Sequence, residues 1–270
     1  MPHLERPGGV KIHWEERGSG PLVVLSPYAM SVPQVFDPLE AELSEDHRIL
    51  RYDDRGTGAS GRTGPYDMET GADDLEAVLD EAGGPAVLLS LGDAVHRAAR
   101  VAARRLDLVD AIVAPGGSPA GRAQLAGTDS MVASDSVLEA LLSMGEKDFR
   151  GALRTVVDAG NPQMTDDDVR ERVKLQTEYQ SHDAVVARWR AWAEDDATEA
   201  GRECGGRLWI LYSEDMTGGW FPSGEEANRV ARRLFPEAHV EEVADGMISR
   251  PDLIAGVVRR ITADAPAPAA

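Results

Sequence analysis

Two side chains able to move protons follow predicted buried strands. Tyr28 comes shortly after the apolar run 22–25, and Asp93 after the run 86–89. A carboxyl group under a lid can have a raised pKa and act as a general acid or base. We therefore treat Asp93 and Tyr28 as a candidate proton-handling pair, with Asp215 as a further catalytic candidate. The competing role of both aspartates is structural, as caps of a helix or turn.

The segment around Asp93 predicts a strand that turns sharply into a helix. Residues 86–89 form a short apolar run without alternation, which is typical of a strand buried on both faces. A tight turn is expected at Gly92, followed by a helix over about 93–105. Small residues lie on one side of this helix, and the other side carries Arg97, Arg100 and Arg104. His96 shares that second side, so we expect it to be partly exposed.

The flanking chain alternates apolar runs with amphipathic segments. Strands are expected over 10–16, 22–25, 48–52, 111–114, 207–212 and 240–243. Further helices are expected over 36–43, 68–81, 225–235 and from 251. Between 118 and 201 the patterns are helical only, over 136–144, 148–157, 166–179 and 184–192.

These landmarks resemble the α/β-hydrolase fold superfamily. Asp53–Ser60 is similar to the family's Asp-x-Arg-Gly-x-Gly-x-Ser turn, and Leu106–Val109 to its Pro-Asp-x-Val segment. The resemblance implies an α/β fold with a mostly parallel central sheet flanked by helices and a helical cap inserted after the sixth strand. It further implies a core over 1–117 and 202–262, a cap over 118–201 and a disordered tail over 263–270.

The same resemblance implies a degenerate catalytic triad. Family members have Gly-x-Ser-x-Gly at the strand–helix turn, where this chain has Ser90–Ala94, so Gly92 occupies the nucleophile position. The acid and histidine positions correspond to Met216 and Met247. Tyr28 corresponds to the residue that supplies one oxyanion-hole N–H, and Asp93 would supply the second.

A substrate pocket is expected between the strand ends and the cap. Methionines would give it a soft apolar lining, and aromatic cap residues could either line it or hold the cap helices together. The expected lining residues are Ala29, Gly92, Met144, Tyr179, His182, Trp189, Trp192, Met216, Trp220 and Met247.

Composition limits the partners. The net charge of −19 argues against nucleic acid and anionic membranes, and the single Cys204 excludes an internal disulfide. No metal-ligand spacing, dinucleotide loop, membrane-length apolar run or signal peptide is recognisable. We expect no cofactor or metal, a small apolar substrate, a monomer or homodimer, and a cytoplasmic location.

Three functions fit these features. The first is a cofactor-independent enzyme without a serine nucleophile, performing C–C bond formation, cyclisation or lyase-type proton transfer on a bulky apolar or polyketide-like molecule of secondary metabolism. The second is an ester or epoxide hydrolase with Asp93 as a shifted nucleophile. The third is a non-catalytic protein that binds or sequesters a small molecule. Fold alone does not decide between them.

Overall fold

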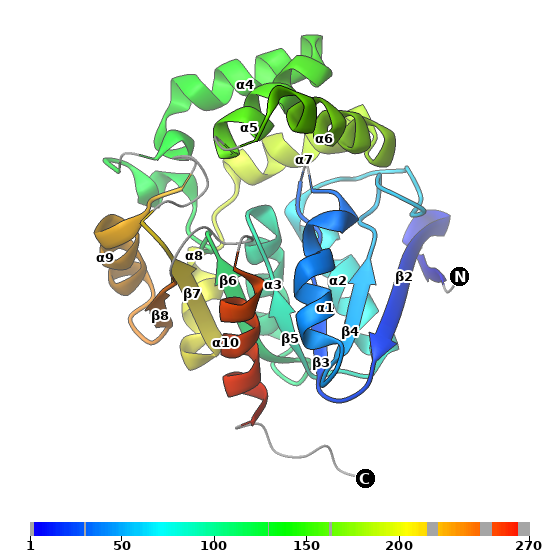
Figure 1. Cartoon of the computed structure of the whole chain (residues 1–270), viewed down its shortest axis with the longest axis vertical. Helices are drawn as coiled ribbons and strands as arrows, with labels where there is room; N and C mark the ends of the chain where they lie inside the picture. Colours follow the sequence, from blue (N-terminus) through cyan, green and yellow to red (C-terminus); the bar gives the residue numbers. More distant parts are fainter. Residues whose placement is uncertain are drawn as a thin grey trace.

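The fold is built on one sheet of eight strands in the order β1-β2-β4-β3-β5-β6-β7-β8 (Figure 1). The computed structural model describes residues 3–29, 31–128, 130–161, 164–214, 221–243 and 250–263. The strands are β1 (His3–Arg6), β2 (Val10–Gly18), β3 (Leu22–Leu25), β4 (Arg48–Tyr52), β5 (Ala86–Leu89), β6 (Val109–Pro115), β7 (Leu208–Tyr212) and β8 (His239–Glu242). β2 pairs antiparallel with β1 and β4, and the remaining pairs are parallel.

The centre of the sheet is apolar because it is covered on both faces. Every residue of β3 and β5 is buried, and the two strands pair in register, Val24 opposite Leu88. Their carboxyl ends therefore lie side by side. This pairing brings the loop after β3 next to the turn after β5.

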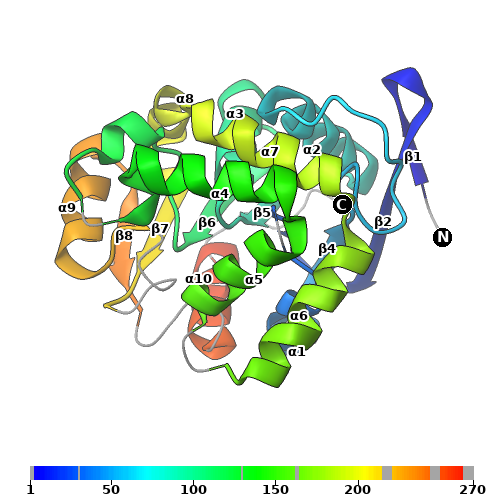
Figure 2. The ribbon, with the colours of Figure 1, turned by 90° about the horizontal axis from the view of Figure 1, so that it is seen from above.

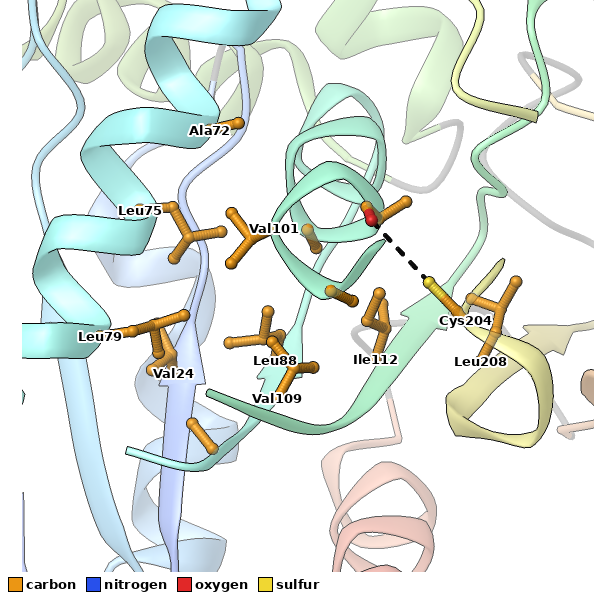
Figure 3. Close-up of a cluster of buried hydrophobic side chains, with 14 of the residues drawn as sticks. Val24, Ala72, Leu75, Leu79, Leu88, Val101, Val109, Ile112, Cys204 and Leu208 are labelled. Atoms are coloured by element: carbon orange, nitrogen blue, oxygen red, sulfur yellow. Dashed lines mark hydrogen bonds between the residues drawn. The ribbon is translucent and has the colours of Figure 1, made fainter. Parts of the chain in front are cut away.

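Helices cover both faces of the sheet. They are α1 (Asp37–Leu43), α2 (Met68–Ala82), α3 (Asp93–Arg104), α4 (Asp135–Lys147), α5 (Phe149–Gly160), α6 (Asp166–Tyr179), α7 (His182–Glu194), α8 (Thr198–Glu203), α9 (Gly224–Leu234) and α10 (Pro251–Ala263). One face packs against α2, α3 and α9, where Leu75 and Val101 meet Leu88 and Ile112 (Figure 3). The other face packs against α1 and α10.

Helices α4 to α7 form a layer over the sheet (Figures 1 and 2). They have an apolar cluster of their own that includes Leu142, Val185 and Trp189. The chain leading from α6 into α7 meets the loop after β4, since Thr57 forms a β-bridge with Gln180. The layer thus lies at the carboxyl ends of the parallel strands. α8 begins inside the predicted cap interval but packs against α3.

The predicted elements are present within a few residues of their expected bounds. β1 and α8 were not predicted, because each is short and carries little apolar periodicity. The predicted tail over 263–270 lies, after its first residue, outside the described residues. Among the described helices, none combines the length and the apolar character that crossing a membrane requires.

Candidate active site at the strand–helix turn

Gly92 holds the sharp turn between β5 and α3. Its backbone angles are φ 52° and ψ −126°, a region that side-chain-bearing residues rarely adopt. A Cβ atom built on Gly92 would meet no atom of the described residues within 4 Å. The turn therefore has the shape that presents a nucleophile in enzymes with the motif Gly-x-Ser-x-Gly, together with space for a side chain, but glycine provides no reactive group.

Backbone amides beside this turn have partners within the protein. The Tyr28 N–H, expected to serve an oxyanion, donates to the Ser31 Oγ at 3.2 Å. The neighbouring Ala29 N–H donates to the Asp93 Oδ1 at 2.7 Å. Of the two amides expected to bind an oxyanion, those of Tyr28 and Asp93, the Tyr28 N–H is thus already bonded to a hydroxyl that an oxyanion would have to displace.

Asp93 also pairs with Arg97, which lies one helical turn later at 3.2 Å. Arg97 lies on the side of α3 opposite the small residues, as predicted, yet it is only 1% exposed. Its guanidinium donates to the Asp54 Oδ1 and to the Pro27 carbonyl oxygen, both at 2.6 Å. Burial by itself lowers the pKa of Arg97, but the carboxylates of Asp54 and Asp93 raise it above its ordinary value. The two buried aspartates supply the negative charge that lets Arg97 be buried. Helical periodicity could not predict these partners.

The same ionic network reaches α7, in the helical layer α4 to α7. Asp54 pairs with Arg188 of α7 at 3.2 Å, and Arg188 donates to the Arg55 carbonyl oxygen at 2.8 Å. Arg55 in turn donates to both carboxylate oxygens of Asp74 on α2. The aspartate and arginine of the loop 53–60 therefore fasten it to helices α2, α3 and α7. Through Arg97 and Arg188, these contacts connect α3 and α7 to the loops after β3 and β4.

Tyr28 lies half-buried beside Asp93. Burial raises the pKa of Tyr28 to about 12, opposed by Arg172 and reinforced by Asp93. Its ring meets Phe36 edge-on, with the ring centroids 6.4 Å apart. At neutral pH the phenol is therefore protonated and can donate a hydrogen bond.

The remaining candidate residues do not share one cavity. Tyr179 lines a cavity with Phe36 and Asp53, and its hydroxyl donates to the Asp53 Oδ1 at 2.5 Å. Trp192 lines a different cavity, beside α3 and α9. Trp189 packs in the cap cluster against the buried Ala29.

Within the cap, Met144 and His182 contact other cap helices. The His182 Nε2 lies 2.9 Å from the Gly145 carbonyl oxygen, and the Met144 Sδ accepts a hydrogen bond from Thr155. Asp215, Met216, Trp220 and Met247 lie outside the described residues.

A further pair of titratable groups is brought together only by the fold. His96, expected to be partly exposed, is 2% exposed, and its Nδ1 lies 2.7 Å from the Asp195 Oδ2. Arg100 donates to both oxygens of Asp195. Burial alone would raise the pKa of Asp195. The hydrogen bonds and charges of His96 and Arg100 outweigh that effect and bring the pKa below its ordinary value. Nothing in the sequence links His96 to an aspartate 99 positions later.

Comparisons with known proteins agree with this architecture. No family model matches the sequence. Over 110 residues the chain is 33% identical to a 2-(acetamidomethylene)succinate hydrolase of Mesorhizobium japonicum. Over 89 residues it is 35% identical to the polyketide synthase ThaQ of Burkholderia thailandensis. These matches cover 40% and 33% of this chain but only 39% and 4% of the two relatives, so the chain spans less than half of their lengths.

The whole chain is similar in structure to a bromoperoxidase of Bacillus anthracis. The TM-score is 0.79 at 14% identity, and the match covers 96% of this chain and 97% of that one. Identity at this level shows the fold alone. The protein has the α/β-hydrolase fold, with an eight-stranded, mostly parallel sheet flanked by helices.

Proposed function

We propose that the protein is a cofactor-independent enzyme that has no serine nucleophile and works by positioning and proton transfer. The observation that carries this proposal is Gly92, which has the backbone of a nucleophile turn and no described residue crowding a Cβ position, but no reactive side chain. C–C bond formation, cyclisation and lyase-type reactions need alignment and proton movement more than they need a nucleophile.

Tyr28 is the proton donor in this proposal. Its pKa of about 12 keeps the hydroxyl protonated, so it can donate a hydrogen bond to a substrate carbonyl or enolate oxygen. Asp93 takes a positioning role, because its carboxylate accepts from Ala29 and pairs with Arg97. Asp215 remains a candidate acid or base.

The substrate class is proposed to be a bulky, apolar, polyketide-like small molecule. Support comes from the aromatic side chains Tyr179 and Trp192 in the two cavities beside the cap. The partial similarity to a protein named a polyketide synthase is consistent with that class.

A hydrolase that uses Asp93 as its nucleophile is less well supported. Attack on an epoxide or ester carbon needs a carboxylate oxygen free to approach the substrate. In this structure one oxygen of Asp93 accepts from Ala29 and the other faces Arg97. A non-catalytic binding protein is the second candidate, since the buried ion network would equally stabilise a binding scaffold.

Labelling with a fluorophosphonate, which reacts with activated serines, tests the proposal. We expect the wild-type protein to remain unlabelled and to leave p-nitrophenyl esters intact, while a known serine esterase reacts with both. Labelling of the wild-type protein would overturn the proposal.

Native mass spectrometry with a library of polyaromatic and polyketide-like compounds, followed by product analysis, then separates catalysis from binding. A bound compound that is altered without added metal or cofactor supports the enzyme. One that returns unchanged supports the binding protein.

A further inference from the structure

Arg172 is a half-buried cation on the side of α6 that faces the core. It shares that side with Gln176 and Tyr179, because positions i, i+4 and i+7 fall on one face of a helix. Gln176 is 4% exposed, and the Tyr179 hydroxyl donates to the Asp53 Oδ1 in the loop after β4. The face of α6 that carries Arg172 is therefore turned toward the carboxyl ends of the strands.

The end of α6 is anchored to the loop that carries Tyr28. The Gln180 side chain donates to the Ser31 carbonyl oxygen, and the Ser31 Oγ donates to the Tyr28 carbonyl oxygen at 2.8 Å. The Tyr28 ring meets Phe36 edge-on just before α1, and α6 lies over α1 (Figures 1 and 2). Burial raises the pKa of Tyr28, and the nearby positive charge of Arg172 opposes that effect. Arg172 and Tyr28 thus belong to one cluster beside the strand–helix turn.

The charge of Arg172 is not matched within the protein. No ion pair joins Arg172 to a carboxylate of the residues that the structure describes, whereas Arg170, an exposed cation of the same helix, pairs with Asp167. Asp93 also acts on Tyr28, but its carboxylate is already paired within α3. A half-buried guanidinium gives up part of its hydration, and an anion placed against it restores the lost interaction. The cluster can therefore accept a negatively charged group from a ligand.

A carboxylate matches these groups in shape and in charge. The planar guanidinium of Arg172 can donate two parallel hydrogen bonds to the two oxygens of one carboxylate. The Tyr28 phenol is protonated at neutral pH, so the cluster presents one unmatched positive charge, which a single negative charge neutralises. The adjoining rings of Tyr28 and Phe36 favour an apolar body next to that charged group.

We propose that Arg172 pairs with a carboxylate of the ligand and holds it beside the Tyr28 hydroxyl, so that the substrate is a carboxylic acid with an apolar body. Arg172 is then a substrate-binding residue that the helical layer α4 to α7 supplies to the site. The role of this acid as a substrate rests on the proposed function, whereas its binding at Arg172 does not.

Benzoate and its neutral analogue benzamide, titrated into the full-length protein, are the probes. They share one ring and differ in the negative charge. By calorimetry at neutral pH and low salt we expect benzoate to bind at least about tenfold more tightly, the factor that a charged hydrogen-bonded pair contributes. In NMR spectra we expect the tyrosine ring carbon next to the Tyr28 hydroxyl to shift until benzoate saturates the site. Equal affinity for the two probes, or an unmoved Tyr28 resonance, would overturn the proposal.

Variants of α6 supply the second measurement. Arg172→Met removes the cation and keeps an unbranched side chain, so benzoate affinity should fall about tenfold or more while benzamide affinity stays unchanged. Arg170→Met removes the exposed cation that pairs with Asp167 and is the matched control, expected to bind benzoate as the wild type does. The same loss in both variants would mean that benzoate responds to the general charge of the helix, which contradicts the assignment to Arg172.

The carboxylate site and the proposed catalytic function can fail separately. If benzoate binding depends on Arg172 but every carboxylic acid that binds is returned unchanged, the carboxylate site is supported and the proposed enzyme is not. If the protein converts neutral compounds and does not distinguish benzoate from benzamide, the enzyme is supported and the carboxylate site is overturned.

Discussion

The carboxylate of Asp93 accepts a hydrogen bond from the Ala29 backbone N–H at 2.7 Å, across 64 positions of sequence. This bond fastens the first turn of α3 to the loop after β3. Arg97 reinforces it, because it pairs with Asp93 and donates to the Pro27 carbonyl oxygen of the same loop. The loop that would supply one oxyanion-hole N–H in an esterase is thus tied to the first turn of α3, which would supply the other.

Replacing Arg97 tests how much this network stabilises the fold. Arg97→Met would leave the carboxylates of Asp54 and Asp93 buried without their main counter-charge. We expect the free energy of unfolding in urea to fall by roughly 3–5 kcal/mol.

Arg104→Met is the control on the same helix, since the Arg104 pairs with Glu69 and Asp73 lie at the surface. Its expected cost is about 1 kcal/mol or less. If both variants lost the same free energy of unfolding, burial of the Arg97 network would add nothing to stability.

Gly92→Ala isolates the backbone strain of the turn. The added Cβ meets no atom of the described residues, so the cost is expected to come from the φ and ψ angles and to be about 1–3 kcal/mol in urea unfolding. Gly256→Ala in α10 also adds a Cβ into open space, but on helical backbone, and should stabilise by up to about 1 kcal/mol. If both variants changed the free energy of unfolding in the same direction, the backbone strain assigned to Gly92 would be refuted.

Tyr179→Phe should loosen the cap from the core. The change removes the hydroxyl that donates to Asp53, while the Ala59 N–H still donates to that carboxylate. We expect a loss of about 1–2 kcal/mol and faster amide hydrogen exchange in α6. Tyr66→Phe, which removes an exposed hydroxyl bonded to the Arg62 carbonyl oxygen, serves as the comparison and should leave exchange in α6 unchanged.

Asp195 should make the fold sensitive to acid. Because its pKa is lower in the folded than in the unfolded chain, the folded state binds fewer protons between those two values. Its stabilising contribution is present above the unfolded pKa and is lost as pH falls toward the folded one. Asp195→Asn is therefore expected to flatten the dependence of unfolding free energy on pH below about 4.

Asp135→Asn removes a carboxylate that is 87% exposed and provides the matched control for the acid series. In this variant the free energy of unfolding is expected to depend on pH as steeply as it does in the wild-type protein. If the free energy of unfolding of Asp195→Asn also depended on pH as steeply as that of the wild type, the His96–Asp195–Arg100 cluster would not contribute to acid sensitivity.

The sequence by itself determined the layered fold and the identity of the turn. Short apolar runs such as Ala86–Leu89 have no stable place except the centre of a covered sheet. A glycine between such a strand and a helix marks a sharp turn, and the structure places Gly92 there with a positive φ. These features are local, since each depends on the order of neighbouring residues, and for that reason they could be predicted without the fold.

Only the tertiary structure decided which charged groups meet. Helical periodicity places Arg97 and His96 away from the small residues of α3, but it contains no information on the elements that pack against that side. Asp54 comes from the loop after β4, and Asp195 from the end of the cap, so both pairs join residues distant in sequence. Burial of arginine and histidine becomes favourable only when such a partner is present. Thus the fold, and not the local sequence, buried Arg97 between two aspartates and made His96 part of the wall of a cavity.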